Sequence, residues 1–75
     1  MQSSIYLLPD AGNCLSRREI DVLKQLADGL TSKETSSALN ISPHTVNFHV
    51  RNAIAKLGAR NTTSAVARAM KMGCW

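Results

Sequence analysis

Residues 31–58, TSKETSSALNISPHTVNFHVRNAIAKLG, decide the fold of this 75-residue chain. The leading T-x-x-E is a capping box that opens a short helix over 31–39, and Asn40 can adopt the left-handed conformation that ends it. Ser-Pro then restarts the chain as an N-cap followed by a proline at the first helical position, which opens a longer helix over 43–57. Two helices separated by about three residues meet at a sharp angle, so the spacing predicts a helix-turn-helix.

Two further helices flank this motif. Ser16 and Glu19 form another capping box, which opens a helix that runs to about Asp28. Asn61 or Thr62 caps a last helix that ends at Gly73. The apolar positions expected in the core are Val22, Leu23, Leu26 and Ala27, then Val46, Val50, Ala53, Ile54 and Leu57, and finally Val66, Ala69 and Met70. The pattern predicts an all-α, four-helix helix-turn-helix domain over residues 15–75.

The first fourteen residues show no periodicity and contain helix breakers, so 1–14 is interpreted as a tail or interdomain linker. No apolar run approaches the roughly 20 residues of a membrane span, and no signal peptide is evident. We therefore expect a cytoplasmic protein. Cys14 and Cys74 lie outside any C-x-x-C pattern and are interpreted as reduced bystanders, with no metal and no cofactor.

Charge is distributed unevenly along the chain. Residues 1–34 carry four basic and five acidic side chains, whereas residues 35–75 carry five basic side chains and no acidic one. Such an asymmetry favours a polyanionic partner, either nucleic acid or an anionic membrane surface, although a solvated basic face is the plainer alternative. The membrane alternative is weak because the basic residues are spread over several faces.

The outward side of the 43–57 helix combines cations, amides and one aromatic ring without a carboxylate. Arg can bond guanine, Asn can bond adenine, and an apolar side chain can touch a thymine methyl group. Asn47, Phe48 and Arg51 are therefore the candidate base-reading residues in the major groove. The alternative for Phe48 is that its ring folds over a neighbouring helix as peripheral core.

The starts of the helices over 31–39 and 43–57 offer free amides and a partial positive charge to phosphate oxygens. The hydroxyl groups of Thr31 and Ser42 serve first as helix caps, and the two roles do not exclude each other. The side chains expected to contact phosphate in this way are Thr31, Ser32, Lys33, Ser42, Lys56 and Arg60.

Catalysis and metal binding find no support in the sequence. His44 and His49 are five residues apart, which places them on different faces of a helix rather than at the spacing of a metal pair. A Ser–His–acid site cannot be assembled from residues 35–75, where acids are absent. We expect no enzymatic activity.

The stretch LSRREIDVLKQLADGLTSKETSSALNISPHTVNFHVRNAIAKLGARN resembles the LuxR-type (NarL/FixJ-type) DNA-binding domain over residues 15–73. The motifs L-S-x-R-E, A-x-G-x-T-x-K-E, I-S-x-x-T-V-x-x-H and K-L-G occur in the family's order and spacing. The resemblance implies that Asn47, Phe48 and Arg51 occupy base-reading positions and that Lys56 contacts phosphate. The N-F-H variant at 47–49 is similar to that of quorum-sensing transcriptional regulators. His44, Thr45, His49 and Asn52 complete the residues expected at the DNA backbone.

The resemblance also implies a homodimer whose contact is the last helix. Ala65, Ala69 and Met72 are the residues expected at that dimer interface, although good helix propensity alone would explain the alanines. A symmetric dimer reads two half-sites about one helical turn apart, so the expected partner is a near-palindromic double-stranded DNA operator, with RNA polymerase as a further partner. The alternative is an interaction module that binds no DNA and instead pairs with a full-length LuxR-type regulator.

Two features depart from the family. Thr35 and Ser36 stand where isoleucine and alanine are usual, and a buried hydroxyl without a partner costs roughly 1–3 kcal/mol. The helix over 31–39 is therefore expected to be loosely packed. The end of the chain also departs, because Cys74 and Trp75 replace small apolar residues.

Overall fold

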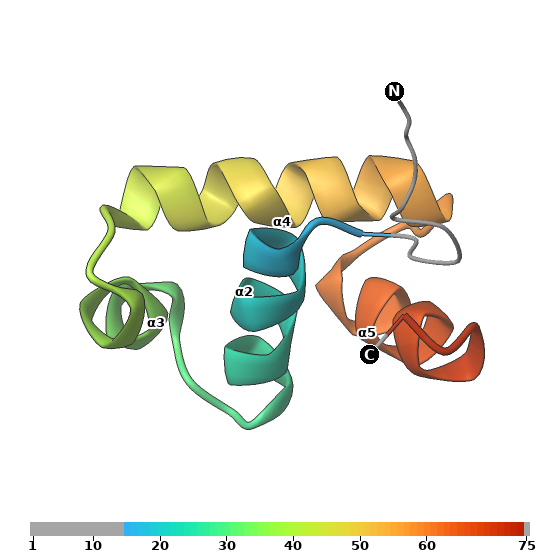
Figure 1. Cartoon of the computed structure of the whole chain (residues 1–75), viewed down its shortest axis with the longest axis horizontal. Helices are drawn as coiled ribbons and strands as arrows, with labels where there is room; N and C mark the ends of the chain where they lie inside the picture. Colours follow the sequence, from blue (N-terminus) through green and yellow to red (C-terminus); the bar gives the residue numbers. More distant parts are fainter. Residues whose placement is uncertain (1–14, 75) are drawn as a thin grey trace.

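The computed structural model describes residues 15–74, and these residues form four helices and no strand (Figure 1). The helices are α2 (Arg17–Ala27), α3 (Ser32–Leu39), α4 (Pro43–Leu57) and α5 (Thr62–Lys71). The predicted all-α, four-helix architecture is confirmed. Trp75, Cys14 and the tail or linker expected over 1–14 lie outside the described residues.

Both predicted capping boxes form. At the start of α2, the Ser16 hydroxyl accepts from the Glu19 amide at 3.2 Å, and the Ser16 amide donates to Glu19 Oε1 at 2.9 Å. At the start of α3, the Thr31 hydroxyl accepts from the Glu34 amide at 3.1 Å, and the Thr31 amide donates to Glu34 Oε1 at 2.8 Å. Each box satisfies amides that the first helical turn leaves without a partner, so the sequence starts both helices at defined residues.

The turn between α3 and α4 has the form that the sequence predicts. Asn40 adopts the left-handed conformation with φ of 57°, and the Ile41 amide donates to the Ser36 carbonyl at 3.0 Å, which closes α3. Ser42 caps α4 by accepting from the Thr45 amide at 3.0 Å, and Pro43 is the first helical residue. The chain therefore turns from α3 into α4 within three residues.

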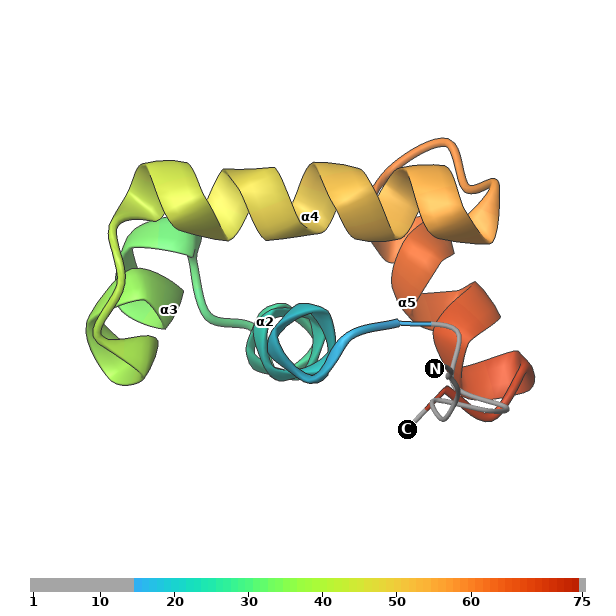
Figure 2. The ribbon, with the colours of Figure 1, turned by 45° about the horizontal axis from the view of Figure 1, so that its top comes forward.

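Helix α4 is the longest element and packs against all three of the others, as Figures 1 and 2 show. In Figure 2, α2 is seen nearly end-on beneath α4, so the two helices cross rather than run alongside each other. Helices α3 and α5 lie at opposite ends of α4 and do not contact each other. The main core cluster consists of Leu15, Leu23, Ala53, Leu57, Ala65, Ala69 and Cys74.

The core of α5 differs from the prediction. Ala65 and Ala69, spaced by four, are fully buried, and their small side chains let α5 approach the other helices closely. Met70, which was expected in the core, lies about 100° around the helix from Ala69 and is 60% exposed. The expectation for Met70 is therefore wrong. The same holds for Ala27, which is exposed at the end of α2.

Cys74 also corrects a prediction. Its side chain is buried in the core cluster, and its amide donates to the Ala69 carbonyl at 2.8 Å. Its sulfur is engaged in a disulfide bond, so Cys74 is not the reduced bystander that its sequence position suggested.

Candidate nucleic-acid interface

The outward face of α4 is formed by Asn47, Phe48 and Arg51, all of which are exposed. Residue 51 is four positions after 47 and three after 48, so the three side chains share one side of the helix. Val46, Ala53 and Leu57 are buried on the opposite side and hold α4 to the core. The structure thus brings the three candidate base-reading residues together on one accessible surface.

Phe48 does not fold over a neighbouring helix. It is 54% exposed, and its ring meets the ring of His49 edge-on, with a centroid separation of 5.5 Å and an interplanar angle of 67°. Large apolar side chains at this exposure, on an otherwise polar face, are typical of an interaction surface. The alternative that Phe48 belongs to the peripheral core is therefore wrong.

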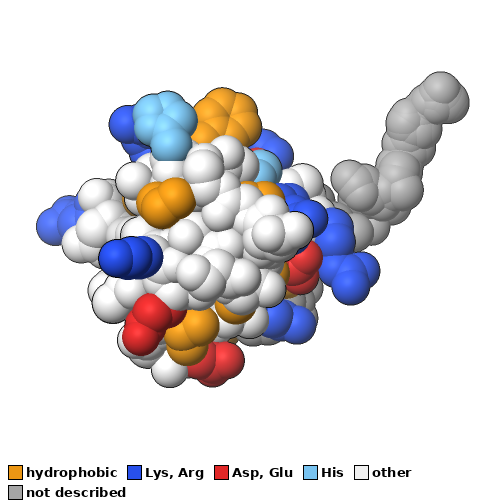
Figure 3. Space-filling view, turned by 90° about the vertical axis from the view of Figure 1, so that its left-hand side faces the viewer, with side chains coloured by type: hydrophobic (Ala, Val, Ile, Leu, Met, Phe, Trp, Pro, Cys, Tyr) orange, Lys and Arg blue, Asp and Glu red, His pale blue; other side chains and the backbone are white. Residues whose placement is uncertain are grey.

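Figure 3 shows the end of the molecule formed by α3 and the beginning of α4. Hydrophobic, His and cationic side chains gather at the top of this face, where α4 lies, and most of the visible carboxylates lie lower. The sequence explains the separation, because α4 and α5 contain no Asp or Glu. The α4 surface can therefore approach a polyanion without meeting a carboxylate of its own helix.

The N-termini of α3 and α4 carry hydroxyl groups at their caps. Ser42 Oγ lies 2.9 Å from Thr45 Oγ1, while Ser32 at the start of α3 donates to Asn47 Oδ1 of α4 at 3.5 Å. The start of α3 and the outward face of α4 are therefore one continuous surface.

The remaining residues expected at the DNA backbone are spread around this surface. The exposed ones are Thr31, Lys33, Ser42, His44, Lys56 and Arg60, and the half-buried ones are Ser32, Thr45, His49 and Asn52. Every one of them keeps some surface that a phosphate group could reach.

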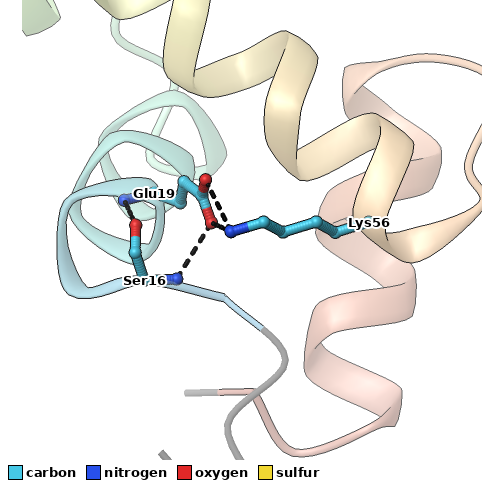
Figure 4. Close-up of polar contacts among 3 residues, drawn as sticks. All are labelled: Ser16, Glu19 and Lys56. Carbon is cyan, nitrogen blue, oxygen red and sulfur yellow. Dashed lines mark hydrogen bonds and ion pairs between the residues drawn. The ribbon is translucent and has the colours of Figure 1, made fainter.

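Lys56 has a partner within the domain that its position in the sequence does not indicate. Its Nζ donates to both carboxylate oxygens of Glu19, at 2.9 and 3.0 Å (Figure 4). Glu19 is only 4% exposed, whereas the Lys56 side chain is about half exposed. The ion pair joins the first turn of α2 to the last turn of α4, so the ammonium group expected at phosphate already has an anionic partner within the domain.

The carboxylate of Glu19 is held in its ionised form. Burial by itself raises the pKa of Glu19, but hydrogen bonds from the Ser16 amide and the Lys56 ammonium, together with the lysine charge, outweigh burial and bring the pKa below its ordinary value of 4.5. The same carboxylate therefore closes the capping box of α2 and binds Lys56.

One signal could have revealed the position of Glu19. It precedes Val22 and Leu23 by three and four residues, which places it on the buried stripe of α2 rather than on the solvent side. A glutamate on such a stripe needs a cationic partner, because a buried unpaired charge is strongly unfavourable. The capping box alone explains a glutamate at this position, so the need for a cationic partner is not evident from the sequence.

A second exposed apolar surface lies on α5. Met70 and Met72 are 60% and 56% exposed, and Met70 borders a hollow of about 620 Å³ between the end of α2 and α5. Ala65 and Ala69, which were expected at a dimer interface, are fully buried inside the domain and have no surface to offer a second chain. Met72 alone of the expected interface residues is exposed.

Within residues 15–74, no helix has both the length and the apolar character that crossing a bilayer requires. The same residues contain no cluster of three or more His, Cys, Asp or Glu side chains that could hold a metal ion.

Comparison with known proteins identifies the family. The profile of the luxR family of bacterial regulatory proteins matches residues 13–69. The chain belongs to this family. The solved structure of the transcription factor GerE superposes with a TM-score of 0.78 at 31% identity, covering 81% of this chain and 91% of GerE. This luxR-family domain thus has the predicted helix-turn-helix fold.

Its relatives include regulators of different kinds. The nitrate/nitrite response regulator NarP of Escherichia coli is 46% identical over 75% of this chain and 26% of its own length. The transcriptional activator SolR of Ralstonia nicotianae is 42% identical over 89% of this chain and 28% of its own length. The quorum-sensing regulator RhlR of Pseudomonas aeruginosa is 47% identical over 80% of this chain and 25% of its own length. The chain spans about a quarter of the length of these relatives. The matched family and these relatives are regulatory proteins rather than enzymes, which confirms the expectation that the chain is not an enzyme.

Proposed function

We propose that this luxR-family domain binds double-stranded DNA sequence-specifically, as part of transcription regulation, by placing the beginning of α4 in the major groove. The observation that carries the proposal is the outward face of α4, where Asn47, Phe48 and Arg51 are exposed together while Val46 anchors the opposite side. The major groove admits one α-helix, and the N-terminal residues of a recognition helix contact base edges.

Within this proposal, the three exposed residues divide the reading of bases by their chemistry. Arg51 can donate two hydrogen bonds to guanine, the Asn47 amide can bond a base edge, and Phe48 can contact a thymine methyl group. Phosphate contacts come from the caps of α3 and α4 and from Lys33, His44 and Arg60, which are exposed around the same surface.

The proposal includes a homodimer on a near-palindromic operator. The exposed methionines of α5, including the expected Met72, support it, because large apolar side chains at 56–60% exposure are suited to contact a partner. RNA polymerase is a further proposed partner, and a regulator that acts on chromosomal DNA would work in the bacterial cytoplasm. Quorum-sensing and nitrate-responsive regulators are both among the relatives, so no signal is proposed.

Selection of bound sequences from a random duplex library tests the proposal. Enrichment of a half-site is expected, and Arg51→Ala should lose about 1–3 kcal/mol of discrimination at one base position. The matched control is Arg68→Ala, which removes an exposed arginine from α5 and should leave the selected sequence unchanged. A loss spread equally over all sequences would assign Arg51 to the phosphates.

The alternative is an interaction module that pairs with a full-length regulator and binds no DNA. The exposed Met70 and Met72 would serve that role equally well. DNA binding at low salt separates the two, since each phosphate contact contributes a slope of about −0.9 to the log–log dependence of affinity on salt. Absence of binding to every duplex at low salt, at concentrations where the domain dimerises, would replace the DNA-binding proposal with this alternative.

A further inference from the structure

Ser32 and Asn47 make the one side-chain hydrogen bond between α3 and α4 found among the described residues. Ser32 Oγ donates to Asn47 Oδ1 across 3.5 Å, although the two residues are fifteen positions apart. Asn47 is exposed, and Ser32 is half-buried at the first position of α3. The contact therefore lies at the edge of the surface that is proposed to meet bases.

The bond has a direction that fixes how the Asn47 amide is turned. A serine hydroxyl can donate to the amide oxygen of asparagine, so Oδ1 faces the start of α3 and Nδ2 faces away from it.

An asparagine whose oxygen is turned towards Ser32 presents its amide to the bases differently from a free asparagine. Bidentate recognition of adenine requires Oδ1 to accept from the adenine amino group while Nδ2 donates to N7. Oδ1 keeps a second lone pair but is turned towards Ser32, so the amide offers the groove chiefly its two Nδ2 hydrogens. They can reach acceptors such as guanine O6 and N7 or thymine O4.

We propose that Ser32 is a positioning residue that sets base specificity by turning the amide of Asn47 so that Nδ2, rather than Oδ1, is presented to the bases. The inference rests on the proposed function, since it concerns how the α4 surface reads DNA. It also changes the role expected for Ser32 itself. A hydroxyl has one hydrogen, and the hydrogen that is donated to Asn47 is not available to a phosphate oxygen.

The test is sequence selection with the wild type and matched variants of the same chain. Ser32→Ala and Asn47→Ala should alter base preference at the same position, with roughly two- to tenfold loss of discrimination against non-acceptor edges, as for one hydrogen bond. Ser32→Thr keeps a hydroxyl and should retain the wild-type preference. Ser37→Ala removes an exposed serine of the same helix and is the control that should change nothing. The double variant of residues 32 and 47 should resemble Asn47→Ala alone.

A second measurement needs no DNA. In the free domain, NMR of the Asn47 side-chain NH₂ group should show one ordered rotamer in the wild type and in Ser32→Thr, and averaged rotamers in Ser32→Ala. The same spectra report whether each variant is folded, so a folding defect is not mistaken for lost positioning.

Three outcomes would overturn the inference. One is an unchanged, ordered Asn47 amide in Ser32→Ala. Another is a loss of affinity in Ser32→Ala that is equal for all sequences and reduces the salt slope, which would make Ser32 a phosphate contact. The third is that Ser32→Ala and Asn47→Ala affect different base positions. Failure of the proposed function looks different, because the wild type itself would then enrich no sequence.

Discussion

The Glu19 carboxylate caps α2 through the Ser16 amide and also binds Lys56. The pH dependence of stability tests both roles. Its pKa is lowered in the folded state, so the stability it contributes is fully present above pH 4.5 and is lost as the pH falls through the lower folded-state pKa. In Glu19→Gln this acid-dependent part of the unfolding free energy should disappear, and the variant should be less stable at neutral pH. Urea unfolding at several pH values between 7 and 3 measures the difference. Asp21→Asn, on the same helix but ion-paired with the exposed Arg17, is the control. An equal acid dependence in Glu19→Gln and the wild type would contradict this account.

Lys56 is predicted to stabilise the fold more than it holds DNA. Lys56→Met keeps the aliphatic chain but leaves the buried Glu19 carboxylate without its cation, which should cost about 1–3 kcal/mol of unfolding free energy. Because Nζ is already engaged by Glu19, the salt dependence of DNA affinity should change by less than the slope of about 0.9 that one phosphate contact contributes. The control is Arg60→Met, an exposed cation for which we expect the opposite pattern. If the slope of log affinity against log salt concentration falls by about 0.9 in Lys56→Met, Lys56 contacts a phosphate group after all.

At the scale of elements, α3 contains two buried hydroxyl side chains, Thr35 and Ser36. Ser36 finds a partner, since its hydroxyl donates to the Lys33 carbonyl at 2.6 Å, but Thr35 is 0% exposed and its Oγ1 has no hydrogen-bond partner among the described residues. Thr35→Val replaces the hydroxyl by a methyl group of similar size. It should raise stability by about 1–3 kcal/mol and slow hydrogen exchange of the α3 amides. Ser36→Ala, which removes a satisfied hydroxyl, should instead lower stability slightly. If Thr35→Val is neutral or destabilising, Thr35 is not the weak point of α3.

The elements were largely predictable because their ends are local chemistry. The capping boxes at Ser16 and Thr31, the Ser42-Pro43 start and the left-handed Asn40 all act within a few residues, so the printed sequence contains the information. What the sequence could not supply is which partner a side chain finds across the fold. The pairing of Glu19 with Lys56 spans 37 positions, and the bond from Ser32 to Asn47 spans fifteen.

At the scale of the whole molecule, the prediction for α5 was wrong at Met70 for a related reason. Helical periodicity alone allows either the side of Ala65 and Ala69 or the side of Val66 and Met70 to face the core. The choice depends on how closely α5 approaches α2 and α4, and small side chains on α5 permit the closer packing. Met70 was expected in the core because it is apolar, yet it lies at the surface while the smaller Ala65 and Ala69 are buried. The surface available for self-association is therefore carried by the methionines.

Met70 and Met72 are predicted to carry the dimer contact. Replacing both by Gln leaves the core untouched, because each is more than half exposed, so the unfolding free energy should change by no more than about 0.5 kcal/mol. Sedimentation equilibrium should show weaker self-association. Affinity for a duplex with two half-sites should fall more than affinity for a duplex with one, because only binding to two half-sites uses the contact between the two protein chains. Ala38→Gln, an exposed change on α3, which does not touch α5, is the matched control for self-association. A double methionine variant that associates like the wild type would place the contact on another face of the domain and leave this apolar surface for a different partner.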